Sequence, residues 1–124
     1  MFKTNRDLGL LILRVGMSAM MLTHGIGKLQ DLFTNPADFA DPLGLGATVS
    51  LVLTVLGEFV APIFIIIGYK TKIAAIPGLI TMLVAAFIVH AKDPIDTKEK
   101  AILYAIFFLA IAITGPGKYA IDKN

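Results

Sequence analysis

Four stretches of apolar residues fill most of this chain, and each is long enough to cross a lipid bilayer as a helix. The hydrocarbon core of a bilayer is about 30 Å thick, and a helix needs about 20 apolar residues to span it. The apolar stretches cover residues 8–29, 49–68, 73–90 and 97–114. The sequence therefore predicts an all-α fold, an integral membrane four-helix bundle that forms a single transmembrane domain over residues 1–124.

The fourth stretch is the shortest, because its fully apolar part covers only Ala101–Thr114. Asp96 and Glu99 have the spacing of a capping box, which predicts a helix that begins at Thr97. The two lysines of the first turn can extend their long side chains to the lipid headgroups. With that extension the fourth helix reaches a spanning length.

A soluble helical bundle is the alternative to a membrane protein, and the composition argues against it. The chain of 124 residues is 56% hydrophobic and 16% charged, with a mean hydropathy of +0.80. A soluble domain of this size would expose large apolar patches, so we expect the lipid bilayer as its partner. The absence of cysteine excludes a disulfide, a thiolate zinc site, an iron–sulfur cluster and a cysteine nucleophile within this chain. Its basic residues form no long run, so no nucleic-acid partner is expected.

The distribution of Lys and Arg between the loops predicts the orientation, since basic loops stay in the cytoplasm. On the side of the two termini lie Lys3, Arg6, Lys70, Lys72, Lys118 and Lys123, whereas Lys28, Lys92, Lys98 and Lys100 fall on the other side. The excess of six over four favours a multi-pass protein of the cell (inner) membrane with both termini in the cytoplasm.

Arg14 and Glu58 are charged residues inside the first two spans. A charge at the centre of a span costs about 2.5 to 3.5 kcal/mol, so it is normally paired or faces a cavity. Counted from the cytoplasmic helix ends, Arg14 lies about 9 Å deep and Glu58 about 15 Å deep, a gap that an arginine side chain can close. Arg14 and Glu58 are therefore the candidate catalytic residues, with a purely structural ion pair as the alternative. Pro62 leaves the carbonyl of Glu58 without a helical partner and predicts a kink there.

The chain has two histidines, His24 and His90. Counted from the cytoplasmic helix ends at 1.5 Å per residue, they lie about 24 and 25 Å deep, both near the outer surface. Spacings of three and four residues put His24 and Lys28 on one seam of the first helix with Arg14 and two methionines. The candidate ligand-binding residues are His24, Lys28, His90 and Tyr104, the last because its hydroxyl lies at the depth of Glu58. The alternatives are interfacial histidines without a role, ordinary packing by the methionines, and a lysine that contacts headgroups. Two histidines alone do not form a metal site, so no metal is expected.

The loop between the first two spans is the longest connection. Asn35 and Pro36 have the pattern of a helix start, with a capping side chain followed by proline at the first helical position. Phe33 and Phe39 could close over the outer site if this loop acts as a lid. A simple connector that rests on the bundle is the alternative.

Several short motifs, taken together and in this order, resemble the DoxX family of small four-helix bacterial and archaeal membrane proteins. The motifs are Arg14-Val15-Gly16, His24-Gly25-Ile26-Gly27-Lys28, Leu56-Gly57-Glu58, Gly68-Tyr69-Lys70-Thr71-Lys72, His90, and Gly115-Pro116-Gly117-Lys118-Tyr119-Ala120-Ile121-Asp122. The family takes its name from a subunit of an archaeal thiosulfate:quinone oxidoreductase. The resemblance therefore implies a four-span fold and, by similarity, a membrane oxidoreductase subunit that interacts with quinone.

Two classes of function follow for such a chain. The first is a quinone-interacting subunit of a membrane redox complex, in which the candidate residues supply hydrogen bonds and proton transfer to the two quinone carbonyls. The sequence contains no flavin, haem or NAD motif, so electrons would need the quinone and a partner subunit. The alternative is a non-redox protein, either a small-solute or proton-coupled transporter or a membrane assembly factor. A second copy of the chain, in a homo-oligomer, is a further partner to consider.

Overall fold

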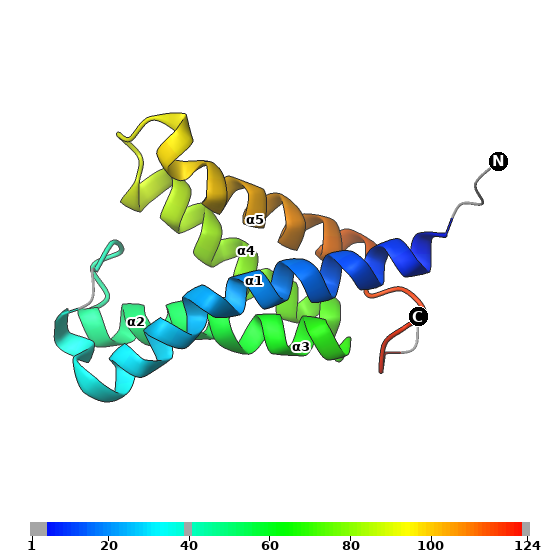
Figure 1. Cartoon of the computed structure of the whole chain (residues 1–124). Coiled ribbons are helices and arrows are strands. Elements are labelled where there is room, and N and C mark those ends of the chain that lie inside the picture. The colour runs from blue at the N-terminus through cyan, green and yellow to red at the C-terminus, as the bar shows by residue number, and fades with distance from the viewer. Residues whose placement is uncertain (1–4, 39–40, 123–124) are drawn as a thin grey trace.

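The chain folds into helices throughout the part that the structure describes, residues 5–38 and 41–122 of a computed structural model (Figure 1). The helices are α1 (Arg6–Thr34), η1 (Pro36–Asp38), α2 (Ala47–Val55), η2 (Leu56–Val60), α3 (Ala61–Ile67), α4 (Thr71–Val84), η3 (Ala85–Val89) and α5 (Ile95–Thr114). The helices α2, η2 and α3 follow one another without a break, as do α4 and η3. The predicted all-α membrane bundle is therefore confirmed. Lys3, Phe39 and Lys123 lie outside the described residues.

Three of the continuous helices are long and apolar enough to cross a membrane, namely residues 6–34, 47–67 and 71–89. At 1.5 Å per residue the first of these, with 29 residues, is about 43 Å long and extends beyond the hydrocarbon core. The fourth helix, α5, has 20 residues and packs lengthwise against α4. Lys98, Glu99 and Lys100 fall in its first two turns, so α5 is too highly charged at this end to count among the apolar helices of membrane-spanning length.

The predicted start of α5 at Thr97 is wrong by two residues, since the helix begins at Ile95 directly after Pro94. Pro94 has an extended backbone (φ −60°, ψ 158°), and its carbonyl accepts a hydrogen bond from the N–H of Thr97. Asp96 lies in the first turn rather than at the cap, where its carboxylate still interacts favourably with the helix dipole. The capping-box spacing therefore predicted the position of the helix start to within one turn but not the first residue of α5.

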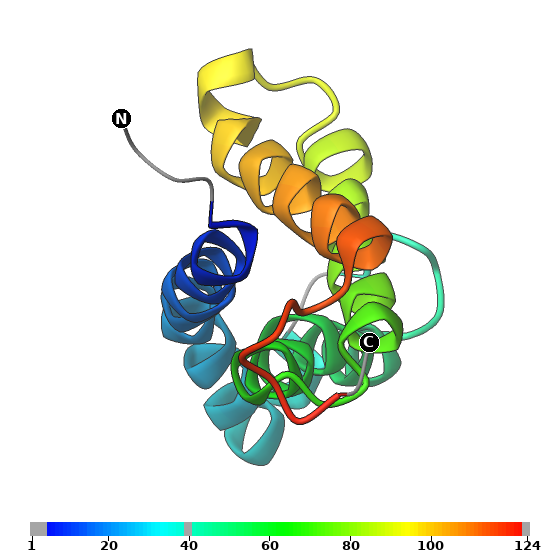
Figure 2. The ribbon, with the colours of Figure 1, turned by 90° about the vertical axis from the view of Figure 1, so that its right-hand side faces the viewer.

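The four spans form two hairpins that meet at one end and diverge at the other (Figure 1). At the closed end, the start of α1, the turn between α3 and α4, and the segment 115–122 come together, and Figure 2 shows this segment crossing the end of α3. At the open end lie the C-terminal part of α1, the segments 35–38 and 41–46, and the turn between η3 and α5. Large apolar side chains such as Ile12, Ile73 and Ile106 are exposed around the outside, as expected for a surface in contact with lipid.

A compact core joins the two hairpins near the closed end. Its fully buried side chains include Met21, Ile65, Phe108 and Ile111. Gly78 allows α4 to lie directly against Phe108, because a Cβ at this position would come within 2.7 Å of the aromatic ring. Such close packing holds the closed end together and leaves the side chains at the open end to define the cavities described below.

Two π-helical turns interrupt the regular helices, η2 in the second span and η3 at the end of the third. In η2 the N–H of Ala61 donates to the carbonyl of Leu56, and in η3 the N–H of His90 donates to the carbonyl of Ala85. The sequence predicts a kink at Glu58, and the irregularity at this position is a π turn that contains Glu58. Single π turns inside α-helices are frequently found at functional sites.

Candidate ligand site around Lys28 and Glu58

Arg14 is fully buried in α1, and its guanidinium binds backbone carbonyls. Its Nε donates to Ile65 (2.9 Å), Nη2 to Ile66 (2.8 Å), and Nη1 to Pro116 (3.0 Å) and Tyr119 (2.8 Å). Ile65 and Ile66 belong to the last turn of α3, where the helix dipole is negative and carbonyls have spare acceptor capacity; the Ile65 carbonyl also accepts a hydrogen bond from the N–H of Gly68 at 3.2 Å. Arg14 therefore caps α3 and attaches the C-terminal segment to it.

The expected ion pair between Arg14 and Glu58 is wrong. Glu58 Oε1 instead accepts a hydrogen bond from Lys28 Nζ at 2.9 Å, and the two side chains are 7% and 30% exposed, respectively. The depth count fails here because it considers only opposite charges as partners, whereas backbone carbonyls at the end of α3 satisfy the arginine. It also places Lys28 at the outer end of the first span, although the flexible lysine stem allows the ammonium to turn back into the bundle.

The C-terminal segment is attached at the closed end by two aspartates as well as by Arg14. Asp122 accepts hydrogen bonds from the N–H groups of Lys70 and Thr71 (2.7 and 2.8 Å) and from Thr71 Oγ1 (2.7 Å), so it caps the start of α4. Asp7 Oδ1 accepts from the N–H of Lys118 at 2.9 Å. Burial alone would raise the pKa of Asp122, but the hydrogen bonds from Thr71 and Lys70 and the charge of Arg14 hold it below its ordinary value.

These contacts account for two of the sequence motifs. The motif 68–72 forms the turn between α3 and α4, and the motif 115–122 is the segment that binds this turn. Gly68 has a left-handed backbone (φ 72°), and a Cβ there would overlap with the Cβ of Ala120. The two motifs therefore specify one structural contact at the closed end, which sequence reasoning missed because each motif was considered alone.

Gly25 brings α1 into direct contact with the backbone of the π turn η2. A Cβ at Gly25 would overlap with the carbonyl oxygen of Glu58, whereas a Cβ at Gly27 would meet nothing within 4 Å. Because the two helices approach so closely, the side chain of Lys28, one turn further along α1, can reach the carboxylate of Glu58. Local sequence therefore positions the ion pair through a glycine and an irregular helical turn.

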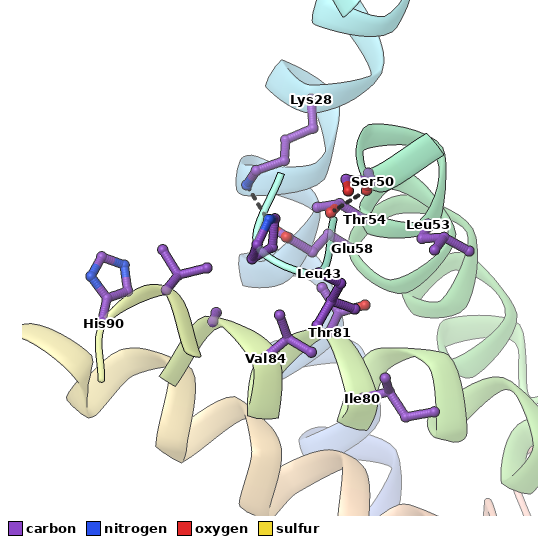
Figure 3. Close-up of a pocket in the computed structure, with 13 residues that line it drawn as sticks. Lys28, Leu43, Ser50, Leu53, Thr54, Glu58, Ile80, Thr81, Val84 and His90 are labelled. Atoms are coloured by element: carbon purple, nitrogen blue, oxygen red, sulfur yellow. Dashed lines mark hydrogen bonds and ion pairs between the residues drawn. The ribbon is translucent and has the colours of Figure 1, made fainter. Parts of the chain in front are cut away.

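The ion pair forms part of the wall of a cavity of about 290 Å³ at the open end, between α2 and α4 (Figure 3). Most of the other lining side chains are apolar, and they include Leu53, Ile80, Val84 and Val89. Leu53, Ile80 and Val89 are also exposed on the outside of the bundle, so the rim of this cavity faces lipid. We call this space the lipid-side cavity.

The loop 41–46 lies over the lipid-side cavity through Pro42 and Leu43. Asp41 holds this part of the loop, since its carboxylate accepts hydrogen bonds from Ser50 Oγ and from the N–H groups of Leu45 and Gly46, each at 2.9 Å. The hydrogen bond from Ser50, followed by that from Gly46, lowers the pKa of Asp41 below its ordinary value.

The lid prediction is only partly matched by the structure. Phe33 is 80% exposed and does not line the lipid-side cavity, which Pro42 and Leu43 cover instead. Phe39 lies outside the described residues. The predicted helix start at Asn35 is a 3₁₀ turn of three residues, Pro36–Asp38, because Asn35 still belongs to the end of α1 and donates its N–H to Asp31.

A second cavity, of about 260 Å³, lies between α1, α4 and α5 and shares the ion pair with the first. His24, His90 and Tyr104 line it together with Lys28 and Glu58, so five of the six predicted site residues surround one space. The rings of His24 and Tyr104 are 6.1 Å apart in an edge-to-face arrangement. Thr97 and Lys100 of α5 also line it, so that polar residues outnumber the apolar ones around this space. We call this space the polar cavity.

His90 lies at the edge of both cavities (Figure 3). Its Nδ1 is 2.7 Å from Asp93 Oδ2, so the aspartate orients the imidazole and leaves Nε2 for a ligand or water. The predicted proximity of His24 and His90 is borne out to the extent that both line the polar cavity. Within the described ranges, no group of three His, Cys, Asp or Glu side chains has a geometry that could hold a metal ion.

Apolar helices and a charged pair between two cavities define a small helical membrane protein with an intramembrane site. The model of the DoxX family matches residues 9–91, and the chain belongs to this family. The match includes Lys28, Glu58 and His90 and ends before α5. The inner membrane protein YqjF of Escherichia coli (strain K12) is 29% identical over 125 residues, which cover 98% of this chain and 95% of the relative. No solved structure matches the chain. The apolar helices and this relative together support an inner membrane protein.

Proposed function

We propose that this DoxX-family protein is a quinone-interacting subunit of a membrane redox complex, and that it binds the quinone ring in the lipid-side cavity. One observation carries the proposal: a buried ion pair forms part of the wall of a mostly apolar cavity whose rim faces lipid. A lipid-soluble ring enters such a space by apolar contact, and its carbonyls need hydrogen-bond donors there.

The hydrogen-bond donors of the lipid-side cavity favour a ligand that carries an acceptor. The hydroxyls of Ser50, Thr54 and Thr81 donate to Asp41 and to backbone carbonyls, so they have no proton left for a ligand. Lys28 uses one of its three ammonium protons on Glu58 and can donate another. We infer that Lys28 binds a quinone carbonyl and that Glu58 holds the lysine in position and exchanges protons.

The other predicted residues have distinct roles in this proposal. Tyr104 and His24 line the polar cavity and His90 lines both cavities, and in this proposal the three residues bind water beside the ion pair. Arg14 acts as a structural residue rather than a catalytic one, because four of its five N–H groups bind backbone carbonyls. When bound, quinone would supply the redox chemistry, and a partner subunit would supply or accept the electrons.

We further propose that both termini face the cytoplasm. Arg6, Lys70, Lys72 and Lys118 gather at the closed end, where α1 begins and the C-terminal segment ends (Figure 1). Basic residues of this kind favour the cytoplasmic side. A fluorescent reporter fused after residue 124 should then be active, and a reporter that works only outside the cytoplasm should be silent.

Quinone extraction from the purified protein tests the ligand. The protein is purified in mild detergent, and its quinone content is compared among the parent, Glu58→Gln and Lys28→Met. Both variants should retain much less quinone, whereas the surface controls Glu99→Gln and Lys72→Met should match the parent. Equal quinone in all five proteins would disprove the quinone site. A co-purified polar solute in place of quinone would favour the transporter alternative.

A further inference from the structure

The ion pair between Lys28 and Glu58 borders two cavities, of which one has a larger share of polar residues than the other. The lipid-side cavity and the polar cavity share Lys28, Glu58, Ala85 and His90 and are otherwise lined by different residues. Beyond these shared residues, apolar side chains of α2, α4 and η3 dominate the first cavity. His24, Tyr104, Thr97 and Lys100 give the second its polar wall. A single carboxylate therefore borders one space suited to a lipid-soluble ligand and another suited to water.

The rim of the polar cavity lies at the open end of the bundle, beside the first turns of α5. Thr97 and Lys100 are exposed there, and the neighbouring turn carries Lys92 and Asp93, which are exposed as well. Charged and hydroxyl side chains at the end of a membrane helix face the aqueous interface. Deeper in the cavity, the buried Tyr104 and the half-buried His24 continue the polar wall towards Glu58.

We propose that the polar cavity is an aqueous route through which Glu58 exchanges protons with the water at the open end, separately from the lipid-side cavity. The route is a feature of this chain's own residues, and only the identity of the ligand on the other side rests on the proposed function. Water in the cavity would be held by Tyr104, His24 and His90, each of which can donate or accept a hydrogen bond.

The proton step involves no redox change. A proton from a water-borne hydronium adds to a carboxylate oxygen of Glu58, which gives a neutral acid and breaks the ion pair to Lys28. The reverse step returns the proton to water and restores the pair. The ionisable groups that line this space are His24 and Lys28 from α1, His90 from the end of η3, and Lys100 and Tyr104 from α5. Four of these five groups are basic.

Single cysteines can test the route directly, because the natural chain contains none. Ala101 lines the polar cavity, and Leu103, two residues further along α5, is exposed on the apolar outside of the bundle. The two positions differ in depth by only about 3 Å. The cysteine thiolate attacks a thiosulfonate reagent, and the thiolate forms in water and not in lipid. In lipid nanodiscs, a charged thiosulfonate should label Ala101→Cys at least tenfold faster than Leu103→Cys, and it should label both at equal rates once dodecyl sulfate has unfolded the protein. Equal rates in the nanodiscs would overturn the aqueous route.

A second measurement follows Glu58 itself. The infrared absorption of its protonated carboxyl is assigned by its loss in Glu58→Gln, and its rise is timed after a rapid fall in pH. Ala101→Phe fills the polar cavity and should slow this rise at least tenfold, whereas Leu103→Phe should leave it unchanged. Circular dichroism and gel filtration establish that both variants are folded. If Ala101→Phe does not fold, the reagent-labelled Ala101→Cys takes its place as the blocked protein. An unchanged rate in the blocked protein would overturn the proposal. Neither measurement uses quinone, so a failed quinone test leaves this result standing, and the reverse also holds.

Discussion

The closed and open ends of the bundle each bury a charged side chain, but they stabilise it in different ways. At the closed end Arg14 donates to four backbone carbonyls on two segments of the chain. At the open end the Glu58 carboxylate pairs with the flexible Lys28 among the described residues, and both residues border two cavities. The difference shows that a buried charge indicates function only when its partners leave space and hydrogen-bonding capacity for a ligand or for water.

Substitution of Arg14 gives the strongest test of this difference. Arg14→Leu leaves buried carbonyls of α3 and of the C-terminal segment without donors, which should lower the free energy of unfolding by about 3 to 5 kcal/mol. Lys28→Met should cost much less, because Glu58 can take up a proton. Thermal unfolding in detergent, followed by circular dichroism, compares the two variants. If Arg14→Leu unfolded at the temperature of Lys28→Met, the two ends would not differ as described.

The contact between α1 and η2 provides the next test, since it positions the open-end pair. Gly25→Ala places a methyl group against the Glu58 carbonyl and should destabilise the protein by about 1 to 3 kcal/mol. Gly27→Ala meets open space and should be neutral or stabilise the helix by about 0.5 to 1 kcal/mol. The same unfolding measurement serves both variants. Equal effects would mean that α1 does not approach η2 so closely.

A double-mutant cycle separates the two charged sites energetically. Lys28→Met and Glu58→Met should be coupled by about 0.5 to 3 kcal/mol, because each residue is the other's partner. Arg14→Leu combined with Glu58→Met should instead be additive to within about 0.5 kcal/mol, since the two residues lie in separate contacts. Unfolding free energies of the single and double variants give both values. A coupling between Arg14 and Glu58 would restore the ion pair that the structure contradicts.

The smallest expected effect concerns the pH dependence of the closed end. The pKa of Asp122 is lowered in the folded protein. Its contribution is therefore fully present above the unfolded value of about 3.9 and is lost as the pH falls through the lower, folded value. The melting temperature of the parent should fall more steeply below pH 4 than that of Asp122→Asn, whose amide does not titrate. Parallel curves for the two proteins would exclude this contribution.

Much of this molecule could be predicted from its sequence, because the lengths of the apolar stretches and the polar residues within them can be read directly from the sequence. The spans, the proximity of His24 to His90 and the irregular turn at Glu58 all follow from such features. The clustering of Glu58 with the two histidines was not predicted, because the count along the helices placed Glu58 about 9 Å less deep. The partner of Arg14 could not be predicted, because backbone carbonyls carry no sequence signal. Lys28 was predicted to bind a ligand beside the histidines, with headgroup contact as the alternative. Its pairing with Glu58 was not predicted, because it depends on the close helix contact at Gly25. The role of Asp122 depends on a contact between two distant segments.

The two π turns also bear on how this site can be traced through evolution. A π turn holds one residue more than an α-helical turn, and η2 and η3 both border the lipid-side cavity. Deleting one residue from 56–60 would restore a regular helix while α2 and α3 kept their orientation, so the side chains that would change direction are those within the turn, Glu58 among them. A relative could then keep the glutamate and lysine and still lack the site. In an alignment, a one-residue gap at these turns is therefore as informative as a change of the charged residues themselves.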